Sequence, residues 1–137
     1  MVSKNIVIQL VIGLLLVVLL YSYISSRAGL GEGEFLVEDP SGDRMVIEVG
    51  PGLEAVDSLI EMHESGDPRW VGGSIEEHDS KFGFRFKPET VVVSEITAEG
   101  LQAVYYETIQ ENLTYWKGLG YVYIEGKVIG VPDSPTG

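Results

Sequence analysis

Two short segments of the sequence bring histidine together with carboxylates, a combination that can bind a transition metal ion. Imidazole and carboxylate are ligands that Zn²⁺ and Cu²⁺ accept, and only a short Gly-Asp-Pro connection and one strand separate the segments. In a chain this acidic, however, any histidine lies near carboxylates by chance, so we expect no cofactor. The candidate metal ligands are His63, Glu64, His78 and Asp79.

Other polar side chains offer weaker chemistry. Glu95 follows a run of valines and Arg85 lies on a neighbouring predicted strand, an arrangement more typical of a structural ion pair than of a general acid. Asp39, Ser41 and Asp43 alternate as in a calcium loop, but the glycine precedes Asp43 and no glutamate stands at the twelfth position, which favours a turn. No nucleophile–histidine–acid motif, phosphate loop or HExxH is present. We therefore expect no enzymatic activity.

Aromatic residues and a sequon suggest contacts at the surface. Trp70, Tyr106 and Tyr115 are candidates for exposed rings, which often mark protein interfaces. Asn112-Leu-Thr114 is an N-glycosylation sequon, although it falls late in a predicted helix near its apolar stripe.

Charge and cysteine content limit the possible partners. Residues 28–137 hold seven basic and all 21 acidic residues, a formal charge of −14. Such a surface repels phosphate backbones, so nucleic acid is excluded as a partner, and the charge serves either solubility or a basic protein partner. The chain has no cysteine, which excludes disulfides and thiolate sites.

The most apolar stretch is Ile6 to Ile24, which has no charged residue. Nineteen helical residues span roughly 28 Å, so this stretch predicts a transmembrane helix in contact with membrane lipid. A signal-anchor with a cytoplasmic amino terminus and an extracytoplasmic domain is favoured, with a cleaved signal peptide as the alternative. The expected organisation is an anchor over 1–26, a flexible tether over 27–33, an acidic domain over 34–131 and a loose tail over 132–137.

The domain is predicted to be α+β, with a mainly antiparallel sheet and two helices on one face. A hairpin is expected over Glu34–Val49 and a helix over Leu53–Ser65. Three strands follow, the last of them (Val91–Thr97) expected in the centre of the sheet. A second helix over Ala98–Trp116 and a final hairpin or bent strand over Tyr121–Val131 complete the domain.

Several motifs are spread along the predicted domain: Val71-Gly-Gly-Ser-Ile75, Phe82-Gly-Phe-Arg-Phe-Lys-Pro88, Glu95, Thr114-Tyr-Trp116 and Lys127-Val-Ile129. Together they resemble a family of small exported domains that is named after a calmodulin-binding protein. The resemblance implies a fold and an exported location but no activity. Phe82, Phe84, Arg85 and Lys87 stand where the family has tryptophans, a histidine and an aspartate, so a family site built on those residues is altered here.

The expected function is that of a non-enzymatic, single-pass membrane protein. Its acidic domain would act as an accessory or structural subunit of a larger membrane or envelope complex, bound to a protein partner. The alternative is an extracytoplasmic ligand- or cation-binding module that uses the clusters around His63 and His78.

Overall fold

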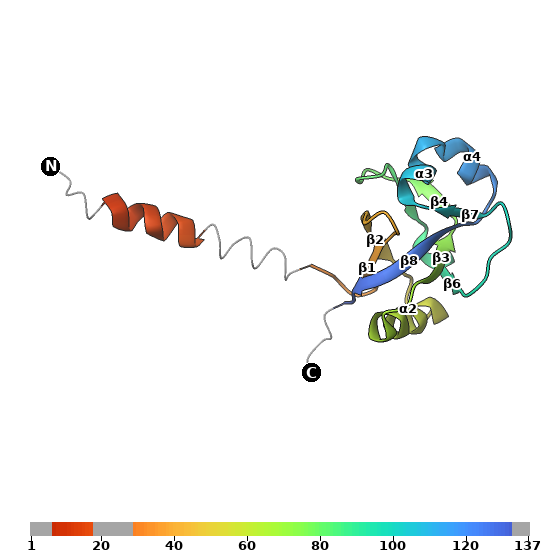
Figure 1. The fold of residues 1–137 in the computed structure, drawn as a ribbon, viewed down its shortest axis with the longest axis horizontal. Helices are drawn as coiled ribbons and strands as arrows, with labels where there is room; N and C mark the ends of the chain where they lie inside the picture. The colour runs from red at the N-terminus through yellow and green to blue at the C-terminus, as the bar shows by residue number, and fades with distance from the viewer. Residues whose placement is uncertain (1–6, 18–28, 133–137) are drawn as a thin grey trace.

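The computed structural model describes residues 7–17 and 29–132 (Figure 1). Residues 29–132 form a domain of eight strands, three α-helices and one short 3-10 helix. In chain order these elements are β1 (Glu34–Glu38), β2 (Arg44–Glu48), α2 (Glu54–Ser65), β3 (Arg69–Gly73), β4 (Ile75–Glu77), β5 (Phe84–Phe86), η1 (Pro88–Thr90), β6 (Val92–Ser94), β7 (Gln102–Val104), α3 (Tyr106–Glu111), α4 (Leu113–Gly118) and β8 (Val122–Gly130).

The predicted transmembrane helix over Ile6–Ile24 is wrong. Within residues 7–17 and 29–132, no helix is both long enough and apolar enough to span a membrane. The apolar stretch is helical over the described residues 7–17. Ile6 and residues 18–24 lie outside the described residues. The signal-anchor and the membrane localisation that were inferred from this helix are corrected with it, whereas the contact with membrane lipid stays a prediction.

The ends of the predicted organisation are only partly described. Residues 27–28 of the predicted tether and 133–137 of the predicted tail lie outside the described residues. The last residue of the tether, Gly33, belongs to the domain, because its carbonyl accepts a hydrogen bond of 2.8 Å from the Val49 N–H.

The main sheet is mostly antiparallel, as predicted for an α+β domain. Its strand order is β2-β1-β8-β3-β6, and β7 pairs with β8 in parallel, while β4 and β5 form a separate two-stranded sheet. The long strand β8 is central because it pairs with β1, β3 and β7. The segment Val91–Thr97 was predicted to form the central strand. It contributes β6 instead, which lies at an edge of the sheet.

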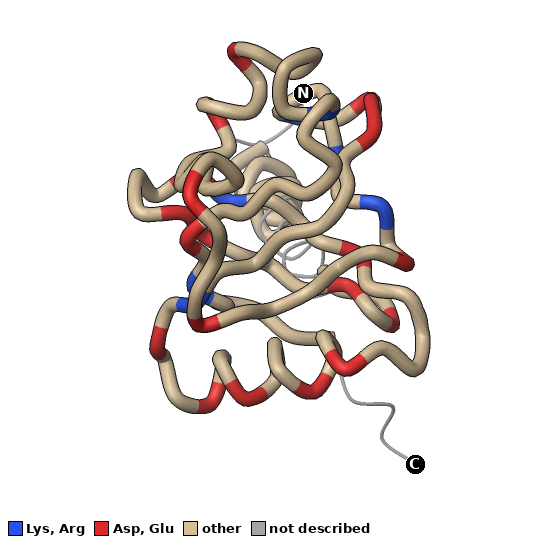
Figure 2. The backbone as a smooth tube through the Cα atoms, turned by 90° about the vertical axis from the view of Figure 1, so that its right-hand side faces the viewer, with Lys and Arg blue, Asp and Glu red and all other residues tan. Residues whose placement is uncertain are grey.

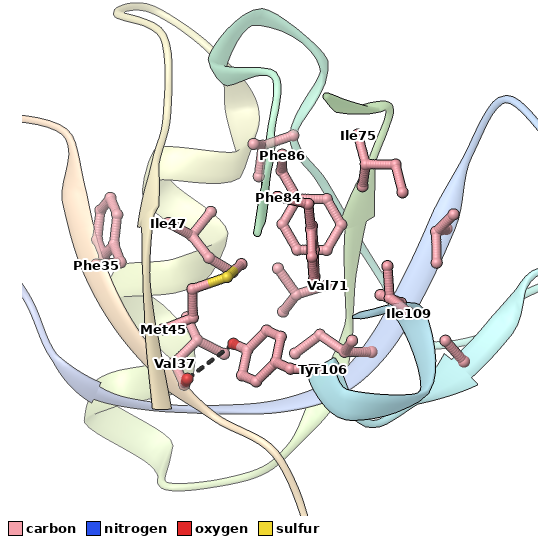
Figure 3. Close-up of a cluster of buried hydrophobic side chains, with 14 of the residues drawn as sticks. Phe35, Val37, Met45, Ile47, Val71, Ile75, Phe84, Phe86, Tyr106 and Ile109 are labelled. Carbon is pink, nitrogen blue, oxygen red and sulfur yellow. Dashed lines mark hydrogen bonds between the residues drawn. The ribbon is translucent and has the colours of Figure 1, made fainter. Parts of the chain in front are cut away.

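One hydrophobic core holds these elements together (Figure 3). Alternate residues of the strands point into it, as the period of two requires, and α2, α3 and α4 add buried side chains. Among the fully buried residues are Phe35, Val37, Ile47, Leu59, Met62, Val71, Phe84, Phe86, Tyr106, Ile109, Val122 and Ile124. On α2 the buried side chains are Ala55, Leu59 and Met62, whereas Ile60 is 38% exposed.

The second predicted helix, Ala98–Trp116, is interrupted. Gly100 adopts a φ of 94°, which an L side chain rarely adopts, and the chain then pairs with β8 as strand β7. Helical structure begins only at Tyr106 and breaks again at Asn112, whose φ of −144° separates α3 from α4. Strand pairing with β8 therefore overrides the helical pattern of this segment.

Candidate functional site

The four predicted metal ligands do not meet. His63 and Glu64 lie near the end of α2, whereas His78 and Asp79 lie in the loop after β4, at the other end of the domain in Figure 1. All four side chains are exposed. Among the residues that the structure describes, no group of three histidine or carboxylate side chains could hold a metal ion.

The pair of Glu95 and Arg85 is not formed. The Arg85 guanidinium contacts Glu76 at 2.7 Å and Glu48 at 3.5 Å, so it joins β4 and β2 to its own strand β5. Glu95 is exposed directly after β6. The arginine therefore has the structural role that its residue type suggested, with different partners.

Asp39 is the only buried carboxylate within residues 7–17 and 29–132, and its exposed fraction is 3%. Its Oδ1 accepts hydrogen bonds from the Ser41 N–H (2.9 Å), the Ser41 hydroxyl (2.6 Å) and the Asp43 N–H (3.1 Å). Its Oδ2 accepts a hydrogen bond of 3.0 Å from the N–H of Tyr106, the first residue of α3. Asp39 therefore closes the β1–β2 turn and joins it to the start of α3.

Tyr106 was predicted to lie at an interface and is instead fully buried. Its hydroxyl donates a hydrogen bond of 2.8 Å to the Val37 carbonyl (Figure 3), and its ring stacks on Phe82 with centroids 5.3 Å apart. Burial, and secondarily the charge of Asp39, raise the pKa of the Tyr106 hydroxyl well above its ordinary value. The helix register predicted for Ala98–Trp116 was wrong, which is why the ring was assigned to the surface.

The raised pKa of Tyr106 predicts an alkaline loss of stability. An unfolded tyrosine ionises near pH 10, whereas folded Tyr106 keeps its proton, so the free energy of unfolding should fall as the pH rises above about 10. Tyr106→Phe removes this dependence and leaves the Val37 carbonyl without its donor, at a cost of about 1–2 kcal/mol at neutral pH. Urea unfolding measures this at pH 7.5 and pH 11. The free energy of unfolding of the wild type should exceed that of Tyr106→Phe at pH 7.5, and the difference should be smaller at pH 11.

The exposed Tyr115 provides the control for this prediction. Tyr115→Phe should leave both the neutral stability and its decline at high pH close to those of the wild type, because its ring is 51% exposed. A wild-type advantage over Tyr106→Phe that stays constant from pH 7.5 to pH 11 would contradict the prediction.

Tyr115 lies where an interface residue was predicted, within a group of exposed apolar side chains. We call Tyr115, Leu119 and Tyr121 the α4 patch; their exposed fractions are 51%, 37% and 42%. Tyr115 and Leu119 are four residues apart, so they share one side of α4 and its end. Tyr121 follows two residues later, directly before β8. The three side chains of the α4 patch therefore come from one short, continuous segment of the chain.

The α4 patch has a rigid support. The Trp116 indole donates a hydrogen bond of 3.1 Å to the Thr108 carbonyl and is 9% exposed. The Tyr115 ring packs edge-on against it, with centroids 5.1 Å apart and an interplanar angle of 78°. Asn112 of the sequon is exposed at the break between α3 and α4, three residues before Tyr115, rather than inside a helix.

The third predicted interface residue, Trp70, is half-buried on β3. Cross-strand pairing places it beside Ser94 of β6 and Glu125 of β8. Asp and Glu residues are spread over the loops and along α2, with few Lys and Arg between them (Figure 2).

Comparison of the chain with models of protein families, with curated proteins and with solved structures found no match, so the family resemblance stays a prediction.

Proposed function

We propose that this chain is a non-enzymatic accessory subunit whose acidic domain binds a protein partner through the α4 patch. The observation that carries the proposal is that Tyr115, Leu119 and Tyr121, each more than a third exposed, lie within one short segment of the chain. Tyrosine is enriched in protein interfaces because its ring buries a large apolar area while its hydroxyl can still hydrogen-bond.

The rigidity of the patch supports a binding role. Because the Tyr115 ring rests against Trp116, which is hydrogen-bonded to α3, its side chain loses little conformational freedom on binding. A pre-ordered aromatic side chain reduces the entropic cost of association.

The charge of the domain indicates the chemistry of the partner. With a formal charge of −14 over residues 28–137, the domain attracts basic surfaces and repels acidic ones. Complementary charge mainly raises the association rate and the selectivity, while aromatic contacts supply most of the affinity. The partner is therefore a protein with a positively charged face around an apolar centre.

The test is isolation of the full chain with its native partner, compared between variants. Tyr115→Ser/Tyr121→Ser should reduce the stoichiometric partner by at least about tenfold, since central aromatic residues often contribute 2 kcal/mol or more each. Tyr105→Ser is the matched control, because Tyr105 is 41% exposed but lies before α3. Retention of the partner by the double variant, or absence of any stoichiometric partner from the wild type, would refute the proposal.

A further inference from the structure

The α4 patch continues onto one face of the main sheet. In β3, Val71 points into the core, so its neighbours Trp70 and Gly72 point to the opposite face. Gly72 is paired with Tyr123, and Trp70 with Glu125. We call Trp70, Val92, Tyr123 and Glu125 the outer face.

The outer face is open and meets the α4 patch at Tyr121. Val92 is 37% exposed, and Trp70, Tyr123 and Glu125 are half-buried. Tyr121 and Tyr123 are two residues apart and so lie on the same side of the chain. Partial burial, and secondarily the neighbouring Tyr121, raise the pKa of the Tyr123 hydroxyl, which is consistent with two adjacent rings. One aromatic surface therefore runs from α4 to Trp70.

The core helix α2 packs on the other side of this sheet. Alternation places Arg69 on the same face as Val71, and its guanidinium contacts Glu61 of α2 at 3.2 Å. Arg69, the residue before Trp70 in the chain, is therefore already paired with an exposed carboxylate of α2.

A hollow of about 420 Å³ lies at the Trp70 end of the outer face. Three carboxylates contribute to its walls, from the chain before β3, from the end of β6 and from β8. The residues around it are Asp67, Pro68, Arg69, Trp70, Glu95 and Glu125.

Most carboxylates in the described part of the chain form no ion pair, and those around the hollow belong to this majority. Glu38, Asp43, Glu48, Glu61, Glu76 and Glu77 each contact a lysine or arginine. Within residues 7–17 and 29–132, Asp67, Glu95 and Glu125 form no ion pair. The half-buried ring of Trp70 lies beside these three carboxylates and beside Arg69, whose charge is paired with Glu61.

From this surface we infer that the outer face docks a basic segment of the partner protein, with an arginine or lysine side chain entering the hollow beside Trp70. The indole face attracts a cation, and the carboxylates complement its charge. Arginine fits best, because its planar guanidinium stacks on an aromatic ring while it donates to carboxylates at its edges. This inference rests on the proposed function and adds the chemistry of the partner.

The two tryptophans of the chain allow a direct test on the full ¹⁵N-labelled protein. The indole N–H signals of Trp70 and Trp116 are recorded by NMR, and Trp70→Phe identifies which signal is which. The probe is the peptide acetyl-Gly-Arg-Gly-amide, and its control is the same peptide with citrulline, which has nearly the same shape without the charge. Binding of a single arginine is expected in the millimolar range, because exposed ion pairs and one cation–π contact are individually weak.

The arginine peptide should shift the Trp70 signal in a saturable manner, and the citrulline peptide should not. The Trp116 signal should stay in place, because its indole N–H is held by Thr108. Glu95→Gln/Glu125→Gln should weaken binding by about tenfold. Glu107→Gln/Glu111→Gln is the matched control: it removes the same charge from exposed positions of α3 and should leave binding unchanged.

An unmoved Trp70 signal, an equal response to citrulline, or equal weakening by both double variants would overturn the inference. These outcomes are distinct from failure of the proposed function. If Tyr115→Ser/Tyr121→Ser releases the native partner while the arginine peptide does not bind, only the arginine inference fails. If the arginine peptide binds while Tyr115→Ser/Tyr121→Ser still retains the native partner, only the proposed role of the α4 patch fails.

Discussion

Asp39→Ala is expected to lower the free energy of unfolding by about 4 kcal/mol. The substitution removes the acceptor of three hydrogen bonds in the β1–β2 turn and of a fourth from the Tyr106 N–H. The Tyr106 N–H then remains buried without its partner, which incurs the full desolvation penalty of that group. Urea or guanidinium unfolding monitored by circular dichroism measures the change.

Asp39→Asn keeps the prediction measurable if the alanine variant does not fold. An amide has one oxygen, whereas Asp39 uses Oδ1 for the turn and Oδ2 for Tyr106. In either orientation the amide NH₂ meets a donor, so we expect an intermediate loss of about 2 kcal/mol. Asp79→Ala is the control, because Asp79 is exposed and the change in charge is the same as in Asp39→Ala; it should alter stability by less than about 0.5 kcal/mol. A stable Asp39→Ala variant, within 1 kcal/mol of the wild type, would show that the turn and α3 are joined by other contacts.

Gly72→Ala should destabilise the domain by about 3 kcal/mol, because the added methyl group has no space. A Cβ at this position would overlap the Val122 carbonyl oxygen and lie 2.8 Å and 2.9 Å from two ring carbons of Tyr123. The backbone cannot move away easily, since β3 is hydrogen-bonded to β8 on one side and to β6 on the other. Denaturant unfolding of the variant measures this effect.

Two further variants separate the contacts at Gly72. Tyr123→Ala in the Gly72→Ala background removes the ring contact but not the carbonyl contact, so it should restore only part of the lost stability. Gly118→Ala is the control, because a Cβ there meets no atom within 4 Å and Gly118 is helical. It should be neutral or stabilising by up to about 1 kcal/mol. Equal losses in Gly72→Ala and Gly118→Ala would contradict the steric explanation.

The local elements of the first half of the domain could be predicted from the sequence. The hairpin of β1 and β2 follows from alternating apolar residues around Asp39-Pro-Ser-Gly-Asp43, and α2 follows from a helical period bounded by glycine and proline. The α+β class and the mainly antiparallel sheet were also predicted. These features depend on neighbours within a few residues, which a sequence pattern reports directly.

The apolar stretch near the amino terminus shows the limit of composition. Its hydropathy alone predicted a membrane-spanning helix over Ile6–Ile24, but the helix described there covers residues 7–17 and no described helix can span a membrane. Hydropathy reports how apolar a segment is and does not by itself establish that the segment spans a membrane.

The sequence by itself determined the acidic charge, the absence of cysteine chemistry, the β1–β2 hairpin, α2 and the exposure of Tyr115. Only the tertiary structure decided that Tyr106 is buried, that Asp39 is the link between the hairpin and α3, and that the two histidine clusters stay apart. The bond from Asp39 to Tyr106 joins residues 67 positions apart, and β7 adopts a strand because β8 offers it hydrogen bonds. The physical reason is that the partners of such groups come from distant segments, so their burial depends on the packing of the whole domain and not on local propensity.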